Sequence, residues 1–270
     1  MTEEAESRPG VDAVAGARMA LGTFTVFPVR VERVDRAVAG WAMLWAPALG
    51  ALLGLVTGVV VAGGVWLGFS APLAALLGVG AGALLTRGLH LDGLADLADG
   101  LGSARPAEGA LEVMRRSDIG PFGVVTLVLV LGAQVLSLGQ LAASSPAAVV
   151  AGAMVAGAVG RSAVTLACTR RVPSARPDGL GANVAGTVGW PGALATVLVV
   201  GVLCVLSGVH SAGLFAVCVA AALSALPVSW FLLRHAIRRL GGITGDVLGA
   251  LAEAATTTAL LTAAGTTAWL

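Results

Sequence analysis

The chain has 270 residues, of which 57% are apolar and 11% are charged, and it contains 38 glycines. Soluble domains are roughly 45–50% apolar and about 25% charged, so this composition excludes an ordinary water-soluble globule. The 16 basic residues are nearly balanced by 15 acidic ones, which gives a net charge of +1. Because binding to nucleic acid depends on excess positive charge, we expect no nucleic-acid partner.

Long tracts without any charged residue alternate with short charged segments. The charge-free tracts are residues 37–86, 119–160, 179–233 and 254–270. A helix needs about 20 mostly apolar residues to cross the hydrocarbon core of a bilayer. The first three tracts can each hold two such helices and the last can hold one. We therefore predict an all-α, polytopic membrane helical bundle with about seven transmembrane helices, over residues 40–66, 72–91, 121–142, 147–168, 190–208, 212–233 and 247–269.

All basic residues are arginines, and on this map they fall on one side of the membrane. None lies in the opposite connectors, near residues 67–71, 143–146 and 209–211. The positive-inside rule therefore places the arginine-bearing connectors in the cytoplasm. We assign residues 1–36 to a cytoplasmic N-terminal segment, in which the apolar stretch 17–29 is too short to span and forms either an interfacial or a re-entrant helix. Residues 37–270 then form one transmembrane catalytic domain with its active site at the cytoplasmic edge.

Small residues recur at every fourth position in the first predicted span. Gly50, Gly54 and Gly58 make two successive small-xxx-small steps. This pattern is typical of a face on which two membrane helices pack closely. It also permits self-association of the chain into a homo-oligomer.

The densest polar block lies between the second and third predicted spans, at residues 86–102. Asp92, Asp96 and Asp99 are spaced so that they share one face of a helix. Like charges on one face repel unless a cation lies among them, and Mg²⁺ binds one or two carboxylates together with water and phosphate oxygens. We therefore predict a Mg²⁺ site, with a solvated acidic face as the alternative. His90 points elsewhere on the helix, as a substrate contact, a proton carrier or a packing residue.

Arginines in three segments are candidates for binding phosphate. Arg115 and Arg116 can each bind phosphate through two hydrogen bonds, or can determine topology by binding anionic lipid. Arg161 falls about two turns inside the fourth predicted span, which is costly unless it faces a cavity or an anion. The connector at residues 170–183 mixes Arg, Gly and Pro up to Asn183, which suits an irregular anion-binding loop.

The segment LGGITGD at residues 240–246 leads into the last predicted span. Gly241, Gly242 and Thr244 precede a helix N-terminus, where backbone N–H groups form a natural phosphate cradle. Asp246 would then extend the acidic face. Alternatively, Asp246 is simply the N-cap of the helix.

Together these segments resemble the membrane-bound cobalamin synthases, also called adenosylcobinamide-GDP ribazoletransferases. The matching segments occur in the family's order and cover nearly the whole chain. They are LHLDGLADLADG (89–100), LEVMR (111–115), GRS (160–162), GLGAN (179–183) and LGGITGDVLGA (240–250).

The resemblance implies a Mg²⁺-dependent enzyme of the bacterial inner membrane, surrounded by membrane lipid. Its reaction would join adenosylcobinamide-GDP to α-ribazole, or to α-ribazole 5′-phosphate, with release of GMP. The 3′-hydroxyl of α-ribazole would attack the phosphate attached to cobinamide. The metal ligands would be Asp92, Asp96, Asp99 and Asp246, and the catalytic residues Asp92 and His90. The residues binding substrate phosphate would be Arg115, Arg116, Arg161, Asn183, Gly241, Gly242 and Thr244.

Two other classes of membrane protein also fit the sequence. CDP-alcohol phosphotransferases and polyprenyl transferases likewise hold Mg²⁺ and a diphosphate on Asp-rich helices at the cytoplasmic edge of a bundle. A transporter would place its acidic residues near the bilayer midplane in broken helices. The predicted position of the aspartates at the membrane edge favours an enzyme.

Overall fold

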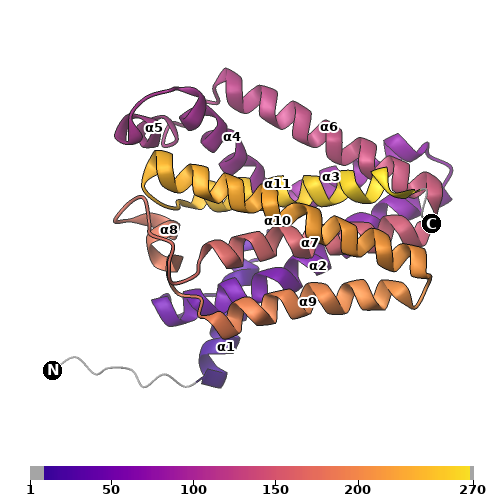
Figure 1. Ribbon diagram of the computed structural model, residues 1–270, viewed down its shortest axis with the longest axis horizontal. Helices are drawn as coiled ribbons and strands as arrows, with labels where there is room; N and C mark the ends of the chain where they lie inside the picture. Colours follow the sequence, from indigo (N-terminus) through magenta and orange to yellow (C-terminus); the bar gives the residue numbers. More distant parts are fainter. Residues whose placement is uncertain (1–8, 268–270) are drawn as a thin grey trace.

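The computed structural model describes residues 9–267, and its regular elements in this range are all helices (Figure 1). Extended pairing in this range is limited to two isolated β-bridges. The predicted all-α class is confirmed. The helices are α1 (Pro9–Phe24), α2 (Arg36–Trp66), α3 (Ala71–Leu85), α4 (Leu89–Gly102), α5 (Ala107–Val113), α6 (Pro121–Ser144), α7 (Pro146–Ala167), α8 (Gly179–Val184), α9 (Trp190–Gly208), α10 (Ala212–Leu240) and α11 (Gly245–Gly265).

The long helices run side by side, so the bundle has two ends (Figure 1). We call one of them the polar end: it carries α4, α5, α8 and the turn between α10 and α11. The connectors from α2 to α3, from α6 to α7 and from α9 to α10 lie at the opposite end (Figure 1). The predicted grouping of the arginine-bearing connectors at one end of the bundle is confirmed.

Within the described part of the chain, six helices are long and apolar enough to cross a membrane, namely α2, α6, α7, α9, α10 and α11. Helix α3 has 15 residues and meets α4 at a bend of 90°, and the pair would supply a seventh crossing. We take α3 as the apolar part of that crossing. Helix α4, which carries three aspartates, lies outside it at the polar end. The structure therefore agrees with the predicted multi-pass bundle.

The predicted second span, residues 72–91, is wrong at its C-terminal end. Helix α3 stops at Leu85, and Arg87 and Gly88 then adopt left-handed backbone angles, with φ of +54° and +65°. Glycine adopts this conformation readily, which makes position 88 suited to a sharp turn. Arg87 donates a hydrogen bond to the carbonyl of Gly22, 3.2 Å away, and so ties the turn to α1. The acidic segment thus starts a new helix in a new direction.

The ends of other elements also differ from the prediction. Helix α10 continues to Leu240 rather than ending near residue 233, so the last arginines before α11 are helical. In the N-terminal segment the helix is α1 rather than 17–29, and it packs on α2, where the Trp45 indole donates to the Ala13 carbonyl at 3.0 Å. Residues 1–8 lie outside the described range. The division into a segment and a domain at residue 36 stays a prediction.

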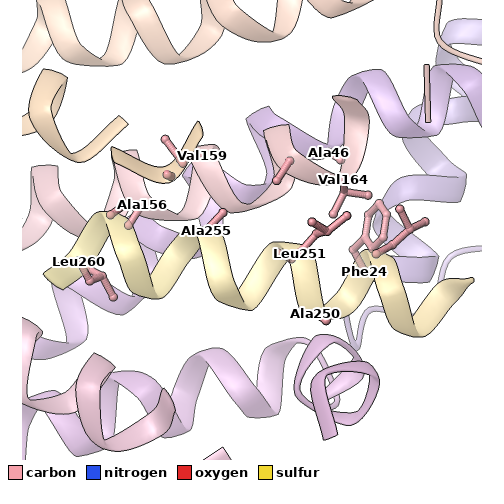
Figure 2. Close-up of a cluster of buried hydrophobic side chains, with 14 of the residues drawn as sticks. Phe24, Ala46, Ala156, Val159, Val164, Ala250, Leu251, Ala255 and Leu260 are labelled. Atoms are coloured by element: carbon pink, nitrogen blue, oxygen red, sulfur yellow. The ribbon is translucent and has the colours of Figure 1, made fainter. Parts of the chain in front are cut away.

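The core forms where α7 packs against α2 on one side and against α11 on another, and α7 and α11 are the most buried of the candidate spans. Figure 2 shows Ala156 and Val159 lying close to Ala255 within this core. Gly54 on α2 faces α7 so closely that an added Cβ would overlap the carbonyl of Ala153. Such contact between backbones gives the dispersion energy that holds membrane helices together. The predicted glycine packing face on α2 is therefore confirmed.

Candidate functional site

Helix α4 lies across the first turn of α11 and reaches the N-terminus of α6 (Figure 1). A Cβ added to Gly93 would come within 2.8 Å of the Cα of Asp246. One added to Gly249 would come within 3.0 Å of the carbonyl oxygen of His90. Because neither glycine has a side chain, the two helices cross at backbone contact. The crossing brings the acidic face of α4 beside the start of α11.

Three of the four predicted metal ligands gather at this crossing. Asp92 is exposed, and Asp96 and Asp246 are half-buried. Partial burial, followed by the charges of Asp92, Asp246 and Asp99, raises the pKa of Asp96 to about 7. Asp246 in turn experiences the charge of Asp92. We call Asp92, Asp96 and Asp246 the carboxylate cluster.

Asp99 does not join this cluster, although the sequence groups it with Asp92 and Asp96. Its carboxylate accepts hydrogen bonds from the backbone N–H of Gly120 at 2.7 Å and of Gly123 at 3.0 Å. These N–H groups belong to the N-terminus of α6, where a negative charge is favourable. Asp99 is 8% exposed and serves as a cap that joins α4 to α6. This role explains its buried carboxylate without a metal.

Arg176 is the basic residue that accompanies the carboxylate cluster. It lies in the connector between α7 and α8. Its positive charge opposes part of the rise in the pKa of Asp96, and it also acts on Asp246. Its guanidinium donates to the carbonyl of Leu111 at 2.8 Å, whereas its buried Nε has no hydrogen-bond partner among the described residues. The mixture of Arg, Gly and Pro in this connector predicted an anion-binding loop but did not single out Arg176. The sequence signal for Arg176 was its place directly before Pro177 and two residues before Asp178.

His90, predicted to be catalytic, faces the interior of the bundle. Its side chain is 3% exposed and stacks on Phe24, with ring centroids 5.6 Å apart. Its Nδ1 lies 3.4 Å from the guanidinium of Arg161. Burial, followed by the charge of Arg161, lowers the pKa of His90 well below its usual value. The structure thus places a buried, packed imidazole here, on the side of α4 away from the carboxylate cluster.

Arg161, predicted to bind phosphate, is likewise internal. It is 8% exposed and lines a pocket of about 80 Å³ between α2, α3, α6, α7 and α11. Glu253 lines the same pocket and accepts a hydrogen bond from Gln134 at 2.8 Å. Opposite charges in an apolar bundle stabilise each other, which offsets part of the cost of burying them. Arg161 therefore contacts α4 from the interior of the bundle, through His90.

The other predicted phosphate-binding arginines lie on the loop after α5. Arg115 and Arg116 are exposed, and Arg115 forms an ion pair with Asp178 at 3.3 Å. With side chains 56% and 71% exposed, this pair contributes little stability. It does join the α5 loop to the connector that carries Arg176. Asn183 is exposed on α8 at the same end of the bundle.

The glycine segment before α11 is held by backbone pairing. Ile243 donates to the carbonyl of Pro173 at 2.9 Å, and Ala175 donates to the carbonyl of Ile243 at 3.0 Å. Gly242 is packed so tightly against this connector that no Cβ fits there, and Gly241 ends α10 with φ of +87°. The glycines therefore place the connector of Arg176 beside α11. This pairing uses backbone groups of the segment that was predicted to cradle phosphate.

Thr244, rather than Asp246, is the N-cap of α11. Its hydroxyl accepts from the N–H of Val247 at 3.2 Å and also donates to the carboxylate of Asp246 at 3.2 Å. The alternative in which Asp246 only caps the helix is therefore wrong. The carboxylate of Asp246 instead accepts the Thr244 hydroxyl and experiences the charge of Asp92 on α4.

Within residues 9–267, no three His, Cys, Asp or Glu side chains are arranged to hold a metal by themselves. The donor chemistry of the carboxylate cluster nevertheless suits Mg²⁺. This ion commonly binds one or two carboxylates and completes its octahedron with water and phosphate oxygens. A bound diphosphate would supply the missing ligands, and Arg176 would face it.

Comparisons with known proteins show similarity over nearly the whole chain. A family model described as cobalamin-5-phosphate synthase matches residues 16–264. The chain is 42% identical over 267 residues to the adenosylcobinamide-GDP ribazoletransferase of Frankia casuarinae, covering 93% of this chain and 94% of the relative. Identity to the protein of the same name from Nocardioides is 42% over 245 residues, with coverage of 90% and 96%. The Escherichia coli protein of that name is 37% identical over 209 residues, with coverage of 77% and 81%.

The fold and the site together define a polytopic helical membrane protein with acidic and basic side chains gathered at one end of its bundle. No solved structure matches the chain. The chain belongs to the cobalamin-5-phosphate synthase family. The resemblance found in the sequence is thereby confirmed.

The position of Asp99 leads to a prediction that separates it from the carboxylate cluster. Asp99→Ala removes the acceptor for two N–H groups at the start of α6, so we expect a loss of about 0.5–2 kcal/mol in the free energy of unfolding. Asp92→Ala removes an exposed carboxylate from a repulsive cluster, so we expect no such loss. Thermal unfolding of both variants in detergent measures the difference. Equal stability of Asp99→Ala and the parent protein would contradict the capping role.

Proposed function

We propose that this chain is an adenosylcobinamide-GDP ribazoletransferase of the cell membrane. It would join adenosylcobinamide-GDP to α-ribazole, or to its 5′-phosphate, and release GMP. Relatives with that name match nearly the full length of the chain, which supports the assignment. The observation that carries it is the carboxylate cluster beside Arg176, because a transfer at a diphosphate needs both a cation site and a basic group.

In the proposed reaction, the 3′-hydroxyl oxygen of α-ribazole forms a bond to the phosphate attached to cobinamide. The bond between that phosphate and GMP breaks, and GMP leaves with the bonding electron pair. The proton of the attacking hydroxyl passes to a carboxylate, for which we propose Asp92, the exposed member of the cluster. Asp96 and Asp246 would hold Mg²⁺ together with Asp92. When bound, this ion would neutralise the diphosphate and stabilise charge on the reacting phosphate.

The basic residues would orient the diphosphate. Arg176 lies close enough to Asp96 and Asp246 for its charge to act on both, and its Nε has no hydrogen-bond partner among the described residues. Arg115 and Arg116 lie on the neighbouring loop and would reach the same substrate from the solvent side. A guanidinium fits phosphate through paired N–H donors, which fixes orientation as well as charge. His90 and Arg161 would act indirectly, by supporting α4.

Asp246 provides the sharpest test of this site. Because Thr244 supplies the cap, Asp246→Ser leaves the start of α11 intact and removes one proposed Mg²⁺ ligand. We expect GMP release from adenosylcobinamide-GDP and α-ribazole to fall about a hundredfold or more, with a raised Mg²⁺ requirement. Glu108→Ser, which removes an exposed carboxylate on α5, is the control and should change neither.

The outcomes of this assay separate the proposals. Failure of the parent protein to release GMP with Mg²⁺ would contradict the proposed activity. Full activity of Asp246→Ser with an unchanged Mg²⁺ titration would leave the activity standing and remove Asp246 from the metal site.

We further propose that the polar end faces the cytoplasm. The charge distribution supports this orientation, since arginines populate the connectors of one end only. The native cysteines are all buried, so they can be replaced and single cysteines introduced at exposed positions. A cysteine at Ala104, at the polar end, should resist a membrane-impermeant thiol reagent added to intact cells, whereas one at Ala143 should react. Labelling at Ala104 only would reverse the orientation.

A further inference from the structure

A large apolar cavity lies between α7, α9 and α10, away from the carboxylate cluster. Its volume is about 750 Å³, within the range of roughly 300–1,000 Å³ that is usual for small-molecule sites. No charged residue is among the described residues that line it. We call it the α9–α10 cavity.

The α9–α10 cavity is long and open to the membrane. Along α10 its wall extends from Phe215 to Leu233, about 27 Å at the helical rise of 1.5 Å per residue. Large apolar side chains of the wall, such as Val205 and Leu223, are more than half exposed. Both α9 and α10 are candidate spans, so lipid tails surround this opening. An apolar space of this size favours hydrocarbon over water.

One mouth of the cavity carries positive charge. At the polar end, the wall includes Thr169 and Val172, which flank the exposed pair Arg170 and Arg171 in sequence. On α10 the wall includes Trp230. The guanidinium of Arg234 stacks over this indole, 5.2 Å from the ring centroid, in a cation–π contact.

The opposite mouth has no such charge, because the connector at residues 209–211 contains no arginine or lysine. Basic residues at a membrane surface attract anionic lipid headgroups, and tryptophan favours the boundary between headgroups and tails. The charge asymmetry therefore matches a molecule with an apolar chain and an anionic head.

We propose that the α9–α10 cavity is a binding site for an anionic phospholipid of the surrounding membrane. An acyl chain lies between α9 and α10, and the phosphate lies against Arg234 and the Arg170–Arg171 pair. This inference does not depend on the proposed function, because neither the cavity nor its mouth includes the carboxylate cluster.

Two pairs of variants test the chain and headgroup contacts separately. A Cβ added to Gly201 in the cavity wall meets no atom within 4 Å, so Gly201→Phe can place an aromatic ring in the cavity and obstruct an acyl chain. Gly132 on α6 has equally open space but does not line the cavity, so Gly132→Phe is the control. Arg234→Gln removes the charge at the mouth, and Arg238→Gln removes a charge on the same helix one turn further on.

The measurement is native mass spectrometry of lipid-depleted protein incubated with phosphatidylglycerol or phosphatidylcholine. We expect the parent protein and both controls to retain phosphatidylglycerol in preference to phosphatidylcholine. Gly201→Phe should lose this retention, and Arg234→Gln should weaken it about fivefold, as expected for one basic residue near an anionic headgroup.

Equal retention of the two lipids, or retention that Gly201→Phe leaves unchanged, would overturn the proposal. So would a dimer that forms without lipid and disappears in Gly201→Phe, since it would show a second copy of the chain in the cavity. Should Gly201→Phe fail to fold, the comparison of Arg234→Gln with Arg238→Gln still decides, and equal retention by these two variants would overturn the headgroup contact.

Discussion

The crossing of α4 over α11 is the contact on which the site depends. Two glycines, Gly93 and Gly249, allow the backbones to touch, and a Cβ at either position would meet the other helix at 2.8 to 3.0 Å. This approach joins carboxylates that are about 150 residues apart in the chain into one cluster. Partial burial, followed by the mutual repulsion of these carboxylates, raises the pKa of Asp96 to about 7. A cation and a diphosphate would relieve that repulsion, which links the packing of two helices to the proposed chemistry.

Charged and polar side chains inside the bundle hold α4 in place for this contact. Arg161 reaches His90 from α7, and Glu253 lies across the same small pocket, bonded to Gln134. This pocket has a volume of about 80 Å³, which is large enough for water, because one water molecule needs about 10–15 Å³. Buried charges in membrane helices are expensive and are usually associated with function. Here Arg161 contacts His90 on the inner side of α4, while the carboxylate of Asp99 accepts hydrogen bonds from the start of α6 nearer the other end of α4.

The sequence was sufficient to predict the number and approximate position of the spans, but not all of their ends, because charge-free tracts and helix length are local properties. It also predicted the α2 packing face from its glycines. The position of Asp99 could not be predicted this way, since helical spacing puts it near Asp96 but its partner, Gly120, lies 21 residues further along and is brought close only by packing. The bend at Gly88 and the approach of Arg176 to Asp246 depend on the same long-range contacts. A helical period identifies the residues that share one face of a helix. It does not identify the segments of the fold that each end of that face contacts.

The central claim is that Asp92 and Asp246, on different helices, act in one site. A double-mutant cycle on kcat/KM for GMP release, with Asp92→Asn and Asp246→Asn alone and together, tests it most directly. If both carboxylates hold the same cation and diphosphate, the double variant should lose little more activity than the weaker single variant. Losses that simply multiply would show that the two residues act independently, and would contradict the account.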